Sequence, residues 1–560
     1  PRRGREGQQR RPRVVRRAPS LTGTAFAVLF FALAQTPSLL PRSWVLQGAV
    51  AGVSAAIGYG IGATLGAAGR PVARRLAPST QCRTGRRICW AVVLLVSGAA
   101  VVTALLLGRA WQREVRAVLG MAAPESWHAT YILVLAACVV VGLVLVARTL
   151  RLGTRSLQRV LRRVAPGWLA SALGGLIAAV LVGGAIQGML LDSFFETAET
   201  SAALANDTTP PGVVQPVSPT RSGSPESLVE WSTLGSKGQE LVASGPTPQQ
   251  LAAFSGEATQ EPIRVYVGVE SAPDIDQRVR LAMAELDRTN AWDRSVLLVA
   301  TATGTGWVNP QTLAAVEYLT GGDSAVVSLQ YGYLPSWISV LVDGSPAAEA
   351  GVALTRAVQE RWQQLPRDAR PRLLVYGESL GSLGAESAFS DLDDVVATTD
   401  GALFVGPTSA NPLWGQLVSQ RRPGSPVWLP DVGQGGRVVF ADRPDDLPGP
   451  GADPPDVVYL QNSSDPVVWW SPQLLWDRPP WLDGERGPDV SPSMRWYPVV
   501  TFWQVVVDLA SAAEDMPAGH GHRYGPEIVQ ALVTLLAPPE WDADDSARLR
   551  AAVLGDAPTG

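Results

Sequence analysis

Five strongly apolar stretches occupy the first third of the chain. They cover residues 21–40, 44–68, 88–108, 129–147 and 168–191, and none contains an acidic residue. A helix needs about 20 mostly apolar residues to cross a bilayer, and four of the stretches meet this need. The first is interrupted by Gln35 and Pro37. We expect it to be a retained span, with a cleaved signal sequence as the alternative. The pattern predicts an all-α membrane domain of about five transmembrane helices over residues 21–191.

The pattern changes after a Pro-, Ser- and Thr-rich run at residues 206–226. Short apolar runs rich in β-forming residues then alternate with helical stretches. Strands are predicted at 263–269, 295–301, 325–330, 372–376, 402–405 and 457–461, and helices at 274–289, 310–320, 346–364, 380–390, 500–514 and 525–537. Such alternation predicts a mostly parallel sheet covered on both faces. We expect a three-layer α/β domain over residues 261–540, after a linker and entry segment at 192–260 and before a C-terminal tail at 541–560.

Charge divides the chain at the same place. Residues 1–191 contain 24 Arg and 3 Glu, whereas the remainder contains 22 basic and 47 acidic residues. Basic side chains gather on the cytoplasmic flanks of spans, and the Arg-rich positions here are the tail 1–20 and the segments after the second and fourth stretches. This predicts a multi-pass protein of the cytoplasmic membrane with its N-terminus inside and residues 192–560 outside. The acidic half argues against a nucleic-acid partner. We expect no cofactor and no metal.

The candidate nucleophile is Ser379. The predicted strand 372–376 leads directly into Gly377-Glu378-Ser379-Leu380-Gly381, and a predicted helix follows. This is the G-x-S-x-G motif in the strand–turn–helix context of a nucleophile elbow, which exposes the serine at a helix N-terminus. The backbone N–H of Leu380 would then face a developing oxyanion. The alternative is a tight glycine turn with an inert serine, and Glu378 is expected to be structural.

A serine nucleophile needs a base, and the chain has only three His residues. His128 lies beside the membrane domain, so the base should be His520 or His522 in AGHGHRYG. We favour His520 because Gly519 and Gly521 place it in a tight turn. His522 remains the alternative.

The acid that orients the base is predicted to be Asp465, which follows the strand 457–461 and so reaches the same sheet edge as Ser379. Its rivals are more typical of helix caps and turns, namely Asp391, Asp393, Asp394 and Asp400. A second oxyanion donor is expected from TGTGW at 303–307, with Thr305 preferred. A nucleotide phosphate loop is the alternative for this segment, but it lacks the expected lysine.

Several longer runs resemble one family. They are TPSLLPR at 36–42, TGTGWVNP at 303–310, YLPSW at 333–337, YGESLGSLGAES at 376–387, DGALFVGPT at 400–408, SDPVVWW at 464–470 and GHGHRYG at 519–525. They resemble the membrane-anchored α/β-hydrolase family common in actinobacteria. The resemblance implies a serine-hydrolase fold, with Ser379, Asp465 and His520 or His522 matching the triad. The TGTG and SDPV segments also resemble cutinases, although this domain has no cysteines for their disulfides.

These observations lead to one functional hypothesis and two alternatives. We expect a membrane-anchored, extracytoplasmic serine hydrolase, of the esterase, lipase or thioesterase class. Its partners would be lipid or acyl-ester substrates of the cell envelope, membrane lipids and cell-envelope proteins. The second half holds 14 of the 19 Trp residues, which suits an aromatic cleft for acyl chains. The alternatives are an acyltransferase that uses the same acyl-enzyme, and a non-catalytic envelope scaffold.

Overall fold

A computed structural model describes residues 20–76, 83–123, 126, 128–161, 166, 192–449, 451–512 and 516–555. The C-terminal domain is built on a sheet of seven strands, all paired in parallel, in the order β1-β3-β2-β4-β5-β7-β6. The strands are β1 (Ile263–Val267), β2 (Val296–Thr301), β3 (Ser324–Leu329), β4 (Arg372–Glu378), β5 (Gly401–Val405), β6 (Val438–Ala441) and β7 (Val457–Leu460). The expected α/β class is confirmed. The edge strand β6 was not predicted, because four apolar residues give too short a pattern.

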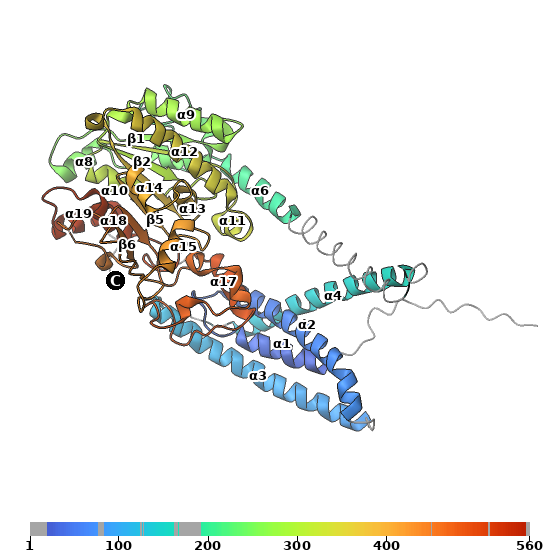
Figure 1. The fold of residues 1–560 in the computed structure, drawn as a ribbon. Coiled ribbons are helices and arrows are strands. Elements are labelled where there is room, and N and C mark those ends of the chain that lie inside the picture. The colour runs from blue at the N-terminus through green and yellow to red at the C-terminus, as the bar shows by residue number, and fades with distance from the viewer. Residues whose placement is uncertain are drawn as a thin grey trace, which may run out of the picture.

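Helices cover both faces of this sheet (Figure 1). On one face lie α9, α12 and α13, and on the other lie α10 and α18, with α19 packed outside them. The helices of this domain are α7 (Gly235–Ala243), α8 (Pro248–Ser255), α9 (Ile275–Arg288), α10 (Pro310–Leu319), α11 (Ser336–Val342), α12 (Ser345–Gln364), α13 (Leu380–Glu386), α14 (Leu392–Thr398), α15 (Pro412–Ser419), α16 (Pro466–Trp469), α17 (Val500–Leu509), α18 (Pro526–Leu536) and α19 (Ala543–Leu554). Because both faces are covered, nearly every strand residue is buried, which explains the continuous apolar runs.

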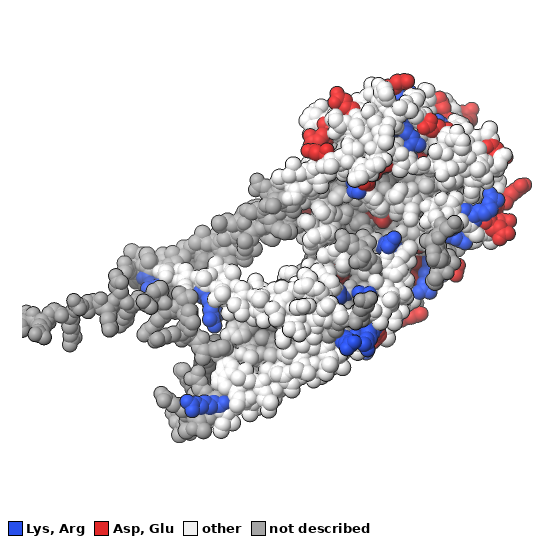
Figure 2. Space-filling model, turned by 180° about the vertical axis from the view of Figure 1, so that it is seen from behind, with Lys and Arg blue, Asp and Glu red and all other residues white. Residues whose placement is uncertain are grey.

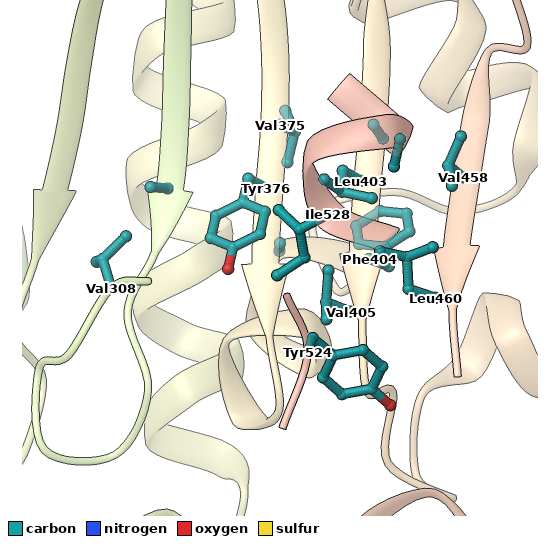
Figure 3. Packing of buried hydrophobic residues seen from close by; sticks show 14 of the residues in the cluster. Val308, Val375, Tyr376, Leu403, Phe404, Val405, Val458, Leu460, Tyr524 and Ile528 are labelled. Atoms are coloured by element: carbon teal, nitrogen blue, oxygen red, sulfur yellow. The ribbon is translucent and has the colours of Figure 1, made fainter. Parts of the chain in front are cut away.

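The hydrophobic core lies on both faces of the sheet, under α9 and α12 on one side and under α18 on the other. Figure 3 shows Ile528 of α18 over Tyr376 and Leu403, while Tyr524 lies beyond the arrowheads of the central strands. Tyr524 therefore marks the carboxyl edge of the sheet, which is where sites of parallel α/β domains are found. The same buried cluster includes Leu39 and Leu40 from the N-terminal part of the chain.

The N-terminal part is helical. Its helices are α1 (Leu21–Leu33), α2 (Trp44–Leu76), α3 (Arg83–Val118), α4 (Ala129–Leu161) and α6 (Asp192–Asn206). Among the residues that the structure describes, three segments are long and apolar enough to cross a membrane, namely Trp44–Gly69, Arg87–Val118 and Ala129–Thr154. Large apolar side chains such as Leu95 and Leu106 are exposed on them. In Figure 2 the visible charged side chains gather mostly on the C-terminal domain, whereas the long helices present a mainly uncharged surface.

The first and fifth apolar stretches, residues 21–40 and 168–191, are not among these three segments. Residues 21–40 form only the 13-residue helix α1, followed by an irregular segment at 34–43. Proline has no backbone N–H to donate, so Pro37 and Pro41 keep that segment out of a helix. Thirteen residues are fewer than the roughly 17 that a span needs. The prediction of a span over residues 21–40 is therefore not met by α1. The stretch 168–191 and the Arg-rich tail before Ser20 lie outside the described residues, so the fifth span and the orientation stay predictions.

Candidate active site

The G-x-S-x-G motif forms a sharp turn between β4 and α13. Ser379 lies at this turn with φ 60° and ψ −126°, a conformation that L-residues rarely adopt. Both glycines of the motif are required by close backbone contacts. A Cβ added at Gly377 would lie 2.1 Å from the Gly381 carbonyl oxygen, and one added at Gly381 would lie 2.2 Å from that of Thr301. The Ser379 N–H donates to the Val405 carbonyl at 2.9 Å, which fastens the turn to β5.

The Ser379 hydroxyl is buried and lines a cavity. The residue is only 2% exposed, and no described residue forms a hydrogen bond with its Oγ. Leu380 is the first residue of α13, so its N–H has no acceptor within the helix. A strained serine at a helix N-terminus, with an unpaired hydroxyl beside a free N–H, has the geometry of a nucleophile elbow.

Asp465 and His522 form a buried pair at the same edge of the sheet. The Asp465 Oδ2 lies 2.6 Å from Nδ1 of His522 and accepts a second hydrogen bond from the Tyr524 hydroxyl at 2.7 Å. Its Oδ1 accepts the Val467 N–H at 2.8 Å at the start of α16. With Nδ1 held by the carboxylate, Nε2 is the ring nitrogen left for proton transfer. His522 and Ser379 line the same cavity, without a hydrogen bond between them.

The loop that carries the histidine is fastened to the loop that carries the acid. The Gly521 carbonyl accepts a hydrogen bond from Asn462 Nδ2 at 2.9 Å, and its N–H donates to Ser464 Oγ at 2.9 Å. These two bonds fix the backbone next to His522. The position of His522 relative to Asp465 is therefore fixed by these two hydrogen bonds to the backbone as well as by the contact between the two side chains.

Two carboxyl groups act on the His522 imidazole. Burial lowers its pKa, but the charge and hydrogen bond of Asp465, with the charge of Glu378, outweigh burial and raise the pKa above its ordinary value. The Glu378 side chain accepts hydrogen bonds from Asn309 Nδ2 at 3.0 Å and from the Tyr376 hydroxyl at 2.8 Å. Burial nevertheless raises the pKa of Glu378. Asp465 and Glu378 therefore stabilise the protonated form of His522, the imidazolium that forms when the base accepts a proton.

The structure places His520, the histidine favoured from the sequence, with a different acid. Its Nδ1 lies 2.7 Å from Oδ2 of the buried Asp489, and it does not line the cavity of Ser379. The flanking glycines do form the expected turn, with φ 80° at Gly519 and 57° at Gly521. The turn, however, directs the two histidines to separate partners, and it is His522 that reaches Asp465.

Thr305 lies in the loop after β2 and lines the cavity. The neighbouring backbone N–H groups are engaged. Those of Thr303, Gly304 and Gly306 donate to the Trp307 carbonyl, to Ser336 Oγ and to the Thr303 carbonyl. No described residue accepts a hydrogen bond from the Thr305 N–H. This N–H and that of Leu380 are therefore both available as donors.

The cavity has a volume of about 480 Å³. Its walls include the apolar side chains of Trp307, Trp337, Val467 and Leu509, and the cations Lys237 and Arg523 also line it. The rival acids lie elsewhere: Asp391 caps α14, and Asp400 accepts the Leu373 N–H beside the start of β4. Within the described ranges, no three His, Cys, Asp or Glu side chains are grouped so that they could hold a metal ion.

Sequence reasoning missed an ion pair behind this cavity. Asp508 on α17 and Arg42 between α1 and α2 have fully buried side chains and lie 3.2 Å apart. Each is the only charged residue of a largely apolar segment, TPSLLPR at 36–42 and VTFWQVVVDLA at 500–510. Opposite lone charges in two apolar segments were the available signal.

The elbow after β4, with an acid and a histidine on loops at the same sheet edge, defines a protein of the α/β-hydrolase class. Comparison with known families matches residues 263–549 to the alpha/beta-hydrolase family and residues 35–246 to the N-terminal region of that family. The chain belongs to the alpha/beta-hydrolase family. No curated protein and no solved structure matches it.

Proposed function

We propose that this protein is a membrane-anchored serine hydrolase that cleaves carboxylic esters of acyl chains. The observation that carries the proposal is the presence of a nucleophile elbow and an aspartate-bound histidine in one cavity. Family membership supports a hydrolase-type function. The triad Ser379, His522 and Asp465, and the ester substrate, are our proposal.

The reaction would follow from the roles that the geometry supports. Ser379 Oγ attacks the ester carbonyl while His522 Nε2 takes its proton, and Asp465 stabilises the imidazolium through Nδ1. The N–H groups of Leu380 and Thr305 donate to the oxyanion. His522 then returns the proton to the leaving alcohol as an acyl-enzyme forms. Water, deprotonated by His522, hydrolyses this ester and restores Ser379.

Two features support an acyl chain at a membrane as the substrate. The cavity walls are largely apolar, with Trp307, Trp337 and Leu509 available to contact methylene groups. The three apolar helices suit an anchor in the bilayer, where such substrates reside. We further propose that residues 192–560 lie outside the cytoplasmic membrane, because the Arg-rich segment after the fourth apolar stretch would lie on the inner side and the stretch 168–191 would cross after it.

The proposal is tested by hydrolysis of p-nitrophenyl acyl esters by the full chain in detergent or vesicles. Ser379→Ala should abolish turnover. Ser387→Ala is a matched control on the same segment, since its hydroxyl bonds only the Leu383 carbonyl. Equal turnover by the wild type and Ser379→Ala would end the proposal.

The orientation has its own test. Val217 is 87% exposed, so Val217→Cys, in a chain whose three cysteines are replaced, presents one accessible thiol. A membrane-impermeant maleimide should label it in intact cells. Labelling only after lysis would reverse the orientation.

A further inference from the structure

Helix α17 lies between the helical region and the rest of the C-terminal domain (Figure 1). Its last residue, Leu509, lines the cavity. One stripe of this helix faces the helical region at four-residue spacing, namely Val500, Gln504 and Asp508. Val500 belongs to the apolar cluster of Phe31, Ala51 and Ile132, and Gln504 Nε2 donates to the Thr36 carbonyl at 2.9 Å. All three stripe residues are fully buried. The helical region therefore contacts α17 along its whole length.

Asp508 is the one charged residue of this stripe. Its Oδ2 accepts the backbone N–H groups of Leu39 and Leu40 at 3.1 and 3.4 Å, and its Oδ1 accepts from Arg42 Nε at 3.2 Å. The Arg42 guanidinium also donates to Gln47 Oε1 at 2.8 Å. Because both charges are fully buried, removing either one would leave the other buried without its counter-ion.

The residues directly after Asp508 form a wall of the cavity. Leu509, Ala510 and Ala512 line it beside Ser379. The Ala512 carbonyl accepts the backbone N–H of His522 at 2.8 Å. Leu40 packs against the same turn, since a Cβ added at Gly521 would lie 3.3 Å from Leu40 Cδ2. A short chain of contacts thus joins Arg42 to the histidine and to the wall.

The far end of α17 is also constrained. Val499, which precedes the helix, has φ 67°, and a β-branched residue adopts this conformation only when its surroundings impose it. Its neighbour Val500 is held in the cluster of the helical region. Both ends of α17 therefore contact the helical region, through Val500 at one end and Asp508 at the other.

We propose that Arg42 is a positioning residue of the active site, acting through Asp508 on the cavity wall and on the loop of His522. The helical region is then part of the catalytic unit as well as its anchor. The catalytic part of this inference rests on the proposed function. Arg42 itself touches no substrate.

The experiment compares Arg42→Gln with Arg264→Gln in the full chain. Arg264 is a matched control, because its ion pair with Glu317 is equally buried at 2.7 Å but is formed between β1 and α10. Two readouts are taken: amide hydrogen exchange over 500–512 and 516–524, and kcat and KM for a short p-nitrophenyl ester. A structural role alone would lower thermal stability in both variants without separating kcat from KM.

Arg42→Gln should raise exchange in both segments and lower kcat roughly 10- to 100-fold, as for a base displaced by about 1 Å. Its KM should change little, because a short ester makes few contacts with the cavity wall formed by Leu509, Ala510 and Ala512. Arg264→Gln should leave exchange in these segments and kcat unchanged. Leu40→Ala, which leaves no unpaired charge, should reproduce the effect in a milder form if Arg42→Gln does not fold.

The outcomes separate the two proposals. Unchanged exchange over 516–524 in Arg42→Gln, or an equal fall of kcat in Arg264→Gln, overturns the positioning role. A wild-type chain as inactive as Ser379→Ala overturns the proposed function, and the exchange data then decide only whether Arg42 holds α17.

Discussion

The two histidines of the Gly-His-Gly-His turn are two residues apart in the sequence, but each contacts a different aspartate. Substituting them one at a time therefore tests which of them is the base. His522→Gln removes the side chain that shares the cavity with Ser379 and bonds Asp465 at 2.6 Å. A positioned general base contributes about 10²- to 10⁴-fold in rate. We therefore expect His522→Gln to lower kcat/KM by about that factor, which is about 3–5 kcal/mol of activation free energy.

His520→Gln should have a different effect. It breaks the 2.7 Å contact with Asp489 and leaves a buried carboxylate without this partner. Losing such a hydrogen bond costs about 1–3 kcal/mol in the free energy of unfolding. Because His520 does not line the cavity, kcat/KM should stay within a few-fold of the wild type.

The assay is hydrolysis of a p-nitrophenyl ester, with thermal unfolding measured on the same samples. Both variants should lose stability, because each leaves a buried carboxylate without its histidine partner. The two variants should differ in rate: a large loss for His522→Gln, and a nearly normal rate for His520→Gln. The reverse pattern, with His520→Gln inactive and His522→Gln active, would refute the assignment of His522 as the base.

Three further predictions concern the same cavity. Since Asp465 raises the pKa of His522 and only the neutral imidazole accepts a proton, kcat/KM should rise with pH through an apparent pKa above 6.5. In Asp465→Asn burial remains, so the apparent pKa should fall and kcat should drop by roughly 10³- to 10⁴-fold; an unchanged pH profile would speak against the pair. Gly381→Ala puts a Cβ 2.2 Å from the Thr301 carbonyl oxygen. It should lower the free energy of unfolding by about 1–3 kcal/mol, measured by denaturant unfolding, and remove esterase activity, measured by the rate of ester hydrolysis. Leu509→Trp narrows the cavity, so the ratio of octanoate to acetate ester hydrolysis should fall, and an unchanged ratio would show that acyl chains bind elsewhere.

The sheet and the elbow could be predicted because their signals are local. β4 is a continuous apolar run, and the G-x-S-x-G motif follows it directly, so strand, turn and helix are adjacent in sequence. The same reasoning placed Asp465 at the carboxyl end of β7. A strand that is buried on both faces of its sheet forms a continuous apolar run, so such strands can be predicted from the sequence.

The choice between His520 and His522 could not be made locally. Both follow a glycine in one turn, and only their partners, Asp489 and Asp465, distinguish them. Asp489 lies in an irregular Pro-rich segment without a pattern to mark it. Their partners are 31 and 57 residues away, so the distinction is a property of tertiary packing.

The contact between the helical region and α17 could not be predicted from the sequence for the same reason. Arg42 and Asp508 are separated by 466 residues, and a single sequence offers many other partners for each. The segment 21–40 looked like a span by composition, but its prolines end α1 at 13 residues and bring Arg42 to α17. Its apolar residues Leu39 and Leu40 are buried against the sheet domain instead.

The central claim is that Ser379 is an activated nucleophile. The most direct measurement is covalent labelling of the full chain in membranes by a fluorophosphonate, with the modified residue located by peptide mass spectrometry. We predict one adduct, on Ser379, that is absent in Ser379→Ala and forms more slowly in His522→Gln. Equal labelling of the wild type and Ser379→Ala, or no adduct on the folded wild-type chain, would contradict the account.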